Sequence, residues 1–321
     1  MPDEMSVIES IVARAGKVPR GYAKIGDDVA VVRQGKGKLV VKVDMLVEHT
    51  DVPSGMTYRQ AARKSVAMCV SDFAAKGVKP DSFMVSLGLR RGVTQEQVEQ
   101  LGLGFRDAER EWGVSLVGGD TNEAHELVVD CAMVGFGARI VPRDGASIGD
   151  ILVVTGPFGY PPSGLRILGA GATARSRFAA AAKKSVLMPT PSLGVGMALA
   201  PYLTSSMDSS DGLARSVHTL ARESGVGFEL ASLPYADGVA EFARANGLDP
   251  KSLVLEGGEE YILVGTLRQS KVRQAKEAAG KVGGELIEIG RATAAEGEVV
   301  LRSRNKWIQI RDAGWTHLSS R

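Results

Sequence analysis

The chain has 321 residues, of which 44% are hydrophobic and 24% are charged, and its formal net charge is +2. A chain of this length usually forms about two domains. Because acids and bases are interleaved and only 5% of residues are aromatic, we expect no nucleic-acid partner and no membrane binding. The start of the sequence does not resemble a signal peptide, and no apolar run approaches the length of roughly 20 residues that a membrane span needs. We therefore expect a cytoplasmic protein.

The first 140 or so residues alternate helix and strand signals. A short helix is expected over residues 6–15, and alternating valines predict a hairpin over residues 27–46 with its turn at GKGK. Thr57 is expected to cap a helix that reaches Ala75 or Lys76, before Gly77 ends it. A strand over 82–89, a helix over 94–111 and strands over 114–120 and 127–138 follow.

The segment PRDGASIGD, residues 142–150, is rich in turn residues and is expected to join two domains. After it we expect a strand over 151–156, helices over 163–168 and 175–185, a proline-led helix in 188–200, and a strand, turn and helix in 205–225. The tail is expected to contain a strand ending at Glu256, a strand over 261–267, a helix over 269–282 and short strands up to Trp315. The pattern predicts an α/β (α+β) chain in two halves.

Several common site motifs are missing from the sequence. It contains no G-x-x-x-x-G-K-[ST] phosphate loop, and GAGATA at residues 169–174 does not leave a convincing strand. His125-Glu126 lacks the second histidine of a zinc motif, and Cys69 and Cys131 form no metal or redox pattern. No serine nucleophile motif stands out.

Carboxylates recur beside glycine or other small residues at the ends of apolar runs. Magnesium prefers oxygen ligands, usually one or two carboxylates together with water and substrate phosphate. Adjacent glycines allow a triphosphate to approach the backbone closely. Six segments have this character: Gly26-Asp27-Asp28, Val43-Asp44-Met45, Ser71-Asp72, Gly118-Gly119-Asp120-Thr121, Asp208-Ser209-Ser210-Asp211-Gly212 and Gly257-Gly258-Glu259-Glu260.

Each segment also has a purely structural explanation. Aspartate at a strand end commonly forms a turn, which would account for Asp120. Asp208, Ser210 or Asp211 is able to cap the helix that follows, although one cap needs only one of them. Asp72 fits a solvated position late in a helix. The argument for magnesium therefore depends on the combination of segments.

In their order and spacing, these segments resemble the thiamine-monophosphate kinase family, which belongs to a superfamily with aminoimidazole ribonucleotide synthetase and selenophosphate synthetase. The resemblance covers nearly the whole chain. The matching motifs are IGDDVAVV, VDMLVEHTDVPSGMTYRQAARKSVAMCVSDFAAKGVKP, LVGGDTN, PRDGASIGDILVVTGPFG, MDSSDGLA, LEGGEEYILVGT and GWTHL.

The resemblance implies an aminoimidazole ribonucleotide synthetase-like fold. Its N-terminal domain, residues 1–140, would bind ATP and Mg²⁺ and form a homodimer through its sheet, and residues 141–321 would form a C-terminal α/β sandwich. It also implies phosphoryl transfer from ATP to thiamine monophosphate with several Mg²⁺ ions. The implied residues are Asp28, Asp44, Asp72, Asp120, Asp208 and Asp211 for metal; Asp120, Asp208 and Asp211 for catalysis; Gly119, Asp120, Arg143 and Ser210 for ATP; and Asp51, Glu259 and Trp315 for thiamine monophosphate.

Three positions depart from the family pattern. Lys42 and Val43 stand where the family often has two hydroxyl residues, Asp51 stands where it often has histidine, and Glu260 replaces the usual aspartate. Two alternatives stay open: a ligase similar to aminoimidazole ribonucleotide synthetase, and a nucleotide-binding homologue without catalysis. A selenophosphate synthetase would need a reactive N-terminal cysteine, and a hydrogenase maturation protein a C-terminal one; neither is present.

Overall fold

The computed structural model describes residues 4–14, 27–34, 37–304, 306–316 and 318. Its first half alternates helices and strands, as the sequence predicts. The elements are α1 (Glu4–Arg14), β1 (Ala30–Gln34), β2 (Gly37–Val47), α2 (Glu48–Asp51), α3 (Tyr58–Lys76), β3 (Pro80–Arg90), α4 (Gln95–Trp112), β4 (Ser115–Ala124) and β5 (Val128–Gly137).

The second half contains shorter elements. They are β6 (Ile151–Val154), α5 (Tyr160–Gly169), α6 (Ser176–Leu187), α7 (Leu193–Leu199), β7 (Leu203–Ser209), α8 (Leu213–Ser224), β8 (Gly227–Leu230), α9 (Val239–Ala245), α10 (Pro250–Leu255), β9 (Ile262–Leu267), a 3₁₀ turn (Gln269–Lys271), α11 (Val272–Lys281), β10 (Ile287–Thr293), β11 (Val299–Ser303) and β12 (Lys306–Gln309).

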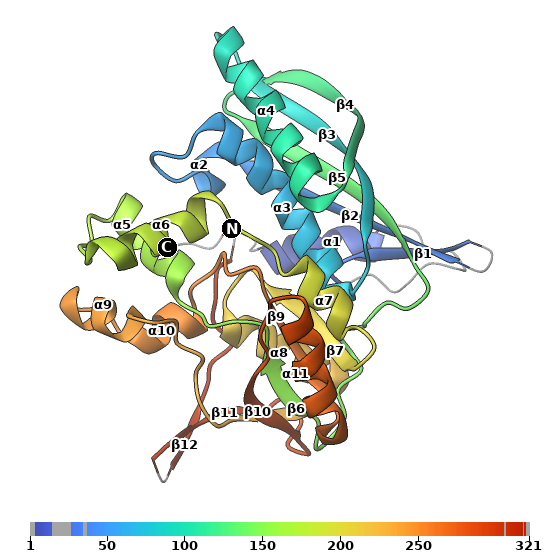
Figure 1. Ribbon diagram of the computed structural model, residues 1–321, viewed down its shortest axis with the longest axis vertical. Helices are drawn as coiled ribbons and strands as arrows, with labels where there is room; N and C mark the ends of the chain where they lie inside the picture. The colour runs from blue at the N-terminus through green and yellow to red at the C-terminus, as the bar shows by residue number, and fades with distance from the viewer. Residues whose placement is uncertain (1–3, 15–26, 35–36, 305, 317, 319–321) are drawn as a thin grey trace.

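Each half is built on its own sheet. The first sheet has the order β1-β2-β5-β3-β4, and the second has the order β12-β11-β8-β10-β6-β9-β7. Figure 1 shows α3 and α4 on one side of the first sheet, and α5, α6, α9 and α10 grouped to one side of the molecule. The opposite face of the first sheet carries exposed apolar side chains: Val43, Met45, Met84 and Phe136. The predicted mixed α/β fold is thus observed, while the domain boundary at 140/141 stays a prediction.

Helix α3 begins and ends where local sequence signals place it. The Thr57 side chain accepts from the Gln60 backbone, the Gln60 side chain accepts from the Thr57 backbone, and Gly77 closes the helix with a left-handed φ of 63°. A Cβ built on Gly77 would lie 2.2 Å from the Ala200 Cβ, so this close contact with the second half requires glycine. At the same end, Ala74 packs against Leu263 of β9.

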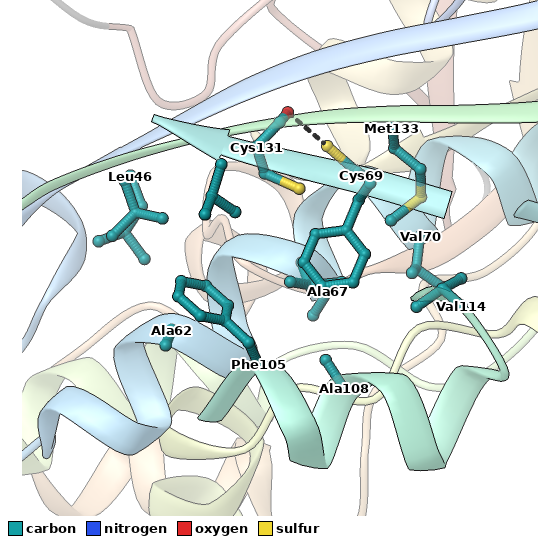
Figure 2. Packing of buried hydrophobic residues seen from close by; sticks show 14 of the residues in the cluster. Leu46, Ala62, Ala67, Cys69, Val70, Phe105, Ala108, Val114, Cys131 and Met133 are labelled. Carbon is teal, nitrogen blue, oxygen red and sulfur yellow. Dashed lines mark hydrogen bonds between the residues drawn. The ribbon is translucent and has the colours of Figure 1, made fainter. Parts of the chain in front are cut away.

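The first core lies between α3, α4 and the sheet. Figure 2 shows Phe105, Val70 and Met133 in the same buried cluster as the two cysteines. Cys69 and Cys131 are both buried and free, and the Cys69 thiol donates to the Cys131 carbonyl at 3.2 Å. These cysteines are small core residues, in agreement with their lack of a metal or redox motif.

Some expected elements differ from those observed. The expected strand ending at Glu256 is wrong, because residues 250–255 form helix α10: the Asp249 side chain caps it and Pro250 occupies its first turn. No strand reaches Trp315 within the described residues, where β12 ends at Gln309. Part of the GKGK turn and residue 15 lie outside the described residues. No described helix has the length and apolar character needed to cross a bilayer.

Candidate functional site

Three buried carboxylates converge from distant parts of the chain. Asp28 precedes β1, Asp72 lies near the end of α3, and Asp208 lies in β7. One oxygen from each carboxylate lies within 4.8 Å of the others. Oxygen donors at this spacing are chemically suited to a hard divalent cation. The sequence left Asp72 as either a metal-site residue or a solvated one. The solvated alternative is wrong, because the Asp72 side chain is only 8% exposed.

Helix α3 brings this cluster together. The Ser71 hydroxyl donates to the Asp208 Oδ2 at 2.7 Å, which ties α3 to β7. The buried Lys76 ammonium, at the end of α3, donates to the Ser206 carbonyl of β7 at 2.8 Å. Because both contacts bridge the two halves, the position of Asp72 relative to Asp208 depends on how the halves pack.

Basic side chains accompany the acids. Lys42 Nζ lies 3.0 Å from Asp44 Oδ1 and 2.8 Å from Asp72 Oδ2. Lys76 Nζ lies 2.7 Å from Asp28 Oδ2. These lysines are residues that our sequence reasoning missed as site residues. Lys42 carries a usable signal, since strand alternation places it on the same face as Asp44.

Asp27 and Arg143 complete this second group of charges. Asp27 Oδ1 lies 2.5 Å from Lys76 Nζ and 3.6 Å from Arg143 Nε. The Arg143 guanidinium also contacts Asp28. Arg143 is therefore held against the acid cluster with its side chain only 22% exposed, and its contact with ATP stays a prediction.

Burial and charge set the protonation of the acids. Burial, reinforced by the Asp28 carboxylate, raises the pKa of Asp208 to about 6. Burial also raises the pKa of Asp72 well above its usual value, with the Asp208 carboxylate among the charges that oppose ionisation. Burial works in the same direction on Asp28, but the Lys76 and Arg143 cations outweigh it and lower the pKa of that carboxyl. Asp72 and Asp208 are therefore easier to protonate than ordinary aspartates, and a bound divalent cation would favour their ionised forms.

The cluster opens into a cleft of about 950 Å³. The three residues predicted to bind thiamine monophosphate, Asp51, Glu259 and Trp315, all line it, and so do Ser210 and Asp211. Glu259 has a left-handed φ of 67°, which is uncommon for a residue with a side chain. Such a left-handed conformation indicates that contacts with the surrounding structure fix the conformation of the Glu259 loop.

Lys64 fixes two of these cleft residues. Its side chain is 1% exposed, and its ammonium donates to the Asp51 carbonyl at 2.8 Å and to Glu259 Oε1 at 2.7 Å. The Asp51 carboxylate accepts from the Val47 N–H and the Thr50 hydroxyl, each at 2.8 Å. The Asp51 side chain thus closes its own turn at α2.

The alternative that the acids in residues 208–211 cap a helix is not supported. The N-cap of α8 is Gly212, which has no side chain to cap the helix. Asp208 lies buried in β7, and Ser210 and Asp211 form the following turn. This turn is held to the glutamate loop, because the Glu259 N–H donates to the Ser210 carbonyl at 2.7 Å.

Gly119 and Asp120 lie elsewhere. Asp120 was expected at a strand end, but that expectation is wrong because β4 continues to Ala124 as the parallel neighbour of β3. A Cβ on Gly119 would lie 2.2 Å from the Val85 carbonyl oxygen. The glycine is therefore required by strand packing, independently of any nucleotide.

The sheet register places Asp120 away from the acid cluster of its own chain. Asp120 of β4 pairs with Ser86 of β3, and Ser86 pairs with Asp130 of β5. Asp130 in turn pairs with Met45 of β2. Directly paired residues share a face of the sheet, and successive residues alternate. Asp120 therefore shares the exposed face of Met45, whereas Asp44 points to the face covered by α3.

Comparison with known proteins agrees with this architecture. A family model described as "AIR synthase related protein, N-terminal domain" matches residues 26–136. A structure described as "AaThiL complexed with AMPPCP and TMP" superposes with a TM-score of 0.85 and 28% identity, covering 98% of this chain and 97% of that one. Residues 26–136 thus match an AIR-synthase-related N-terminal domain, and the whole fold matches that of the AaThiL structure.

Two curated relatives narrow the class. The thiamine-monophosphate kinase of Nitrosopumilus maritimus is 38% identical over 98% of this chain and 98% of its own. The thiamine-monophosphate kinase of Pyrococcus horikoshii is 34% identical over 92% of this chain and 91% of its own. The chain belongs to the thiamine-monophosphate kinase family.

Proposed function

We propose that this protein transfers the γ-phosphoryl group of ATP to thiamine monophosphate, giving thiamine diphosphate and ADP. The observation that carries the proposal is the convergence of Asp28, Asp72 and Asp208 beside a cleft of about 950 Å³ that Glu259 and Trp315 also line. Family membership supports the same activity, as does a structural neighbour described as holding AMPPCP and TMP.

The donor set fits magnesium. Within one chain, the carboxylates of Asp28, Asp44, Asp72, Asp208 and Asp211 would hold the ions, because the cluster offers closely spaced oxygen donors of the type Mg²⁺ prefers. Bound Mg²⁺ supplies positive charge that reduces the repulsion between the triphosphate and the acceptor phosphate. No described histidine or cysteine belongs to the cluster, which disfavours zinc.

The remaining contacts follow from charge and shape. Arg143 supplies a fixed cation beside the acids for the phosphates of ATP, and Ser210 supplies a hydroxyl at the cleft. Trp315, 39% exposed at the cleft wall, offers an aromatic face to the cationic ring of thiamine. The Glu259 carboxylate adds a negative charge close to that cation, and Asp51 shapes the same wall.

The acceptor needs little activation. A phosphate monoester has a second pKa of about 6, so it is mostly a dianion at neutral pH and already nucleophilic. Asp208 and Asp72 therefore act by positioning charge, and neither needs to remove a proton from the acceptor. We propose direct in-line transfer; a phosphorylated protein intermediate that turns over competently would contradict it.

We also propose that the protein is a homodimer and that Asp120 serves the acid cluster of the partner subunit. Asp120 lies on the face of the first sheet opposite Asp44, and three strand spacings, roughly 14 Å, separate their strands. That face carries exposed Val43, Met45 and Phe136, an apolar surface typical of subunit interfaces. Gly119 and Asp120 would then approach ATP from the second chain. The cytoplasmic location stays a prediction.

One assay tests the activity. Purified protein with ATP, Mg²⁺ and thiamine monophosphate should produce thiamine diphosphate and ADP in equal amounts. Ring closure of formylglycinamidine ribonucleotide in place of that product would favour the ligase alternative. Binding of ATP with turnover of neither substrate would favour a non-catalytic homologue.

Mixing variants tests the shared site. Asp120→Asn and Asp72→Asn should each lose activity by several orders of magnitude while remaining folded. Random mixing of the two chains should restore about a quarter of wild-type activity, since half of the dimers would contain one intact site out of two. Absence of recovery in a mixture with demonstrated subunit exchange would place Asp120 and Asp72 in the same-chain site.

A further inference from the structure

Lys42 occupies an unusual place for a lysine. It lies in the middle of β2, with its side chain 20% exposed, and its ammonium bridges Asp44 on the same strand and Asp72 on α3. It also lines the proposed phosphoryl-transfer cleft. An ammonium buried in this way is costly unless it is paired. The two carboxylates supply that pairing and raise the pKa of Lys42 well above its usual value against the effect of burial.

The charges around Lys42 do not cancel completely. When all of them are ionised, the five carboxylates of this network, counting the adjoining Asp208, outnumber its three basic side chains by two. Two uncompensated negative charges correspond to one divalent cation. Without Lys42, the same network would carry a charge of −3. The members are Asp27, Asp28, Asp44, Asp72 and Asp208 with Lys42, Lys76 and Arg143.

A purely structural ion pair would explain only part of this arrangement. One acid, Asp44 on its own strand, would suffice to pair Lys42. The ammonium instead lies between acids of two different elements, and both of these acids line the cleft. Their oxygens at 3.0 and 2.8 Å from one positive centre form the kind of site that a divalent ion would otherwise take.

We propose that the Lys42 ammonium is a permanent cation of the phosphoryl-transfer site, which takes the place of one divalent ion between Asp44 and Asp72. The protein therefore binds one divalent ion fewer than the same chain with a neutral residue at position 42. This inference rests on the proposed metal site. It also gives the site a positive charge that faces the phosphates even when metal is scarce.

Mn²⁺ binding to the full-length protein tests this inference without relying on activity. The free Mn²⁺ signal in electron paramagnetic resonance, measured across a titration, gives the number of ions bound per chain. Lys42→Met should bind one ion more than the wild type, and Lys42→Arg, which keeps the charge, should bind the same number. Lys38→Met is the matched control: it changes a lysine four residues away on β2 that makes no ion pair in the described chain, and its ion count should not change.

Thermal unfolding supplies a second readout. Mn²⁺ should raise the Tm of Lys42→Met more than that of the wild type, because the added ion replaces a lost cation in a buried acid pair. Lys42→Thr should give the same result as Lys42→Met, and it replaces Lys42→Met in both measurements if the methionine variant does not fold. Equal ion counts in the wild type and in the neutral variants would overturn the proposed role of Lys42 but not the metal site. A wild type that binds no Mn²⁺ would overturn the metal site itself.

Discussion

Replacing Lys64 by methionine should destabilise the fold and weaken substrate binding together. Lys64 is 1% exposed, and its ammonium holds both the Asp51 carbonyl and the Glu259 carboxylate. Methionine keeps most of the apolar stem, so the loss of packing is small. The change therefore removes mainly the charge and its hydrogen bonds, and leaves Glu259 beside the cleft without its cationic partner.

The expected magnitude follows from the burial of the pair. Removing one partner of a fully buried ion pair costs about 3–5 kcal/mol. The Glu259 side chain is 21% exposed and can regain some hydration, which reduces the expected cost to about 2–3 kcal/mol. For a chain of this size, each kcal/mol shifts Tm by roughly 2–4 °C, so Lys64→Met should lower Tm by roughly 4–12 °C.

A double-mutant cycle with Glu259→Gln isolates the pair. The two single variants should each be destabilised, and the double variant should be less destabilised than their sum by about 1–2 kcal/mol. The KM for thiamine monophosphate should rise in Lys64→Met, while the KM for ATP should change little, because Glu259 lies on the proposed thiamine side. Arg59→Met is the control on the same helix, since its ion pair with Asp107 is exposed and should matter far less.

An additive cycle would refute this reasoning. If the free energies of unfolding of Lys64→Met and Glu259→Gln simply sum within about 0.5 kcal/mol, the two side chains are not coupled. An equal rise of both KM values would show that Lys64 acts on the whole cleft and that its effect is not specific to the Glu259 wall.

Local signals in the sequence were enough to predict several helices and the acid segments. Thr57 and Thr94 each form a capping box with the glutamine three residues later, and left-handed glycines end both helices. These interactions span only a few residues, so they can be recognised without tertiary information. The failure at residues 250–255 is of a different kind, because the apolar run there suggested a strand while Asp249 and Pro250 carried a helix-start signal.

The arrangement of the site could be predicted only in part. The acids were identifiable by their order, yet the sequence alone does not show that Asp72 meets Asp208, because that depends on how α3 packs between the two halves. Lys42 was noticed only as a departure from the family pattern. Strand alternation predicts that it points inward with Asp44, but its second partner, Asp72, becomes apparent only in the folded chain.

The position of Asp120 was also beyond local reasoning. An apolar run followed by Gly-Gly-Asp suggests a strand end, whereas pairing with β3 extends β4 through Asp120 as far as Ala124. The face on which Asp120 lies follows from its register with Ser86 and Asp130. Register is a long-range property of the sheet, so the separation of Asp120 from the other acids of its chain required the structure.

Three further predictions concern the cleft, the metal and pH. Trp315→Ala should raise the KM for thiamine monophosphate about tenfold, equivalent to about 1.4 kcal/mol of lost cation–π contact. Trp307 is exposed on β12, so Trp307→Ala should leave this KM unchanged, and equal effects of the two substitutions would contradict a specific contact of Trp315. Mg²⁺ should raise Tm more at pH 8 than at pH 5, because Asp208, with a pKa of about 6, must release its proton to bind metal; equal shifts at both values would contradict this.

Glu260 tests the effect of a buried acid on stability. Burial raises the pKa of Glu260 well above its usual 4.5, so the folded chain holds this proton more tightly than the unfolded chain. Its contribution to stability is therefore complete below pH 4.5 and is lost as pH rises towards the folded pKa, by about 1.4 kcal/mol per unit. Glu260→Gln keeps an oxygen that can accept from the Gly159 N–H, now 2.6 Å from Glu260 Oε1, but removes the ionisation. The variant should lose less stability than the wild type between pH 5 and pH 8 in urea unfolding, and parallel pH profiles would show that Glu260 does not hold a tighter proton in the folded state.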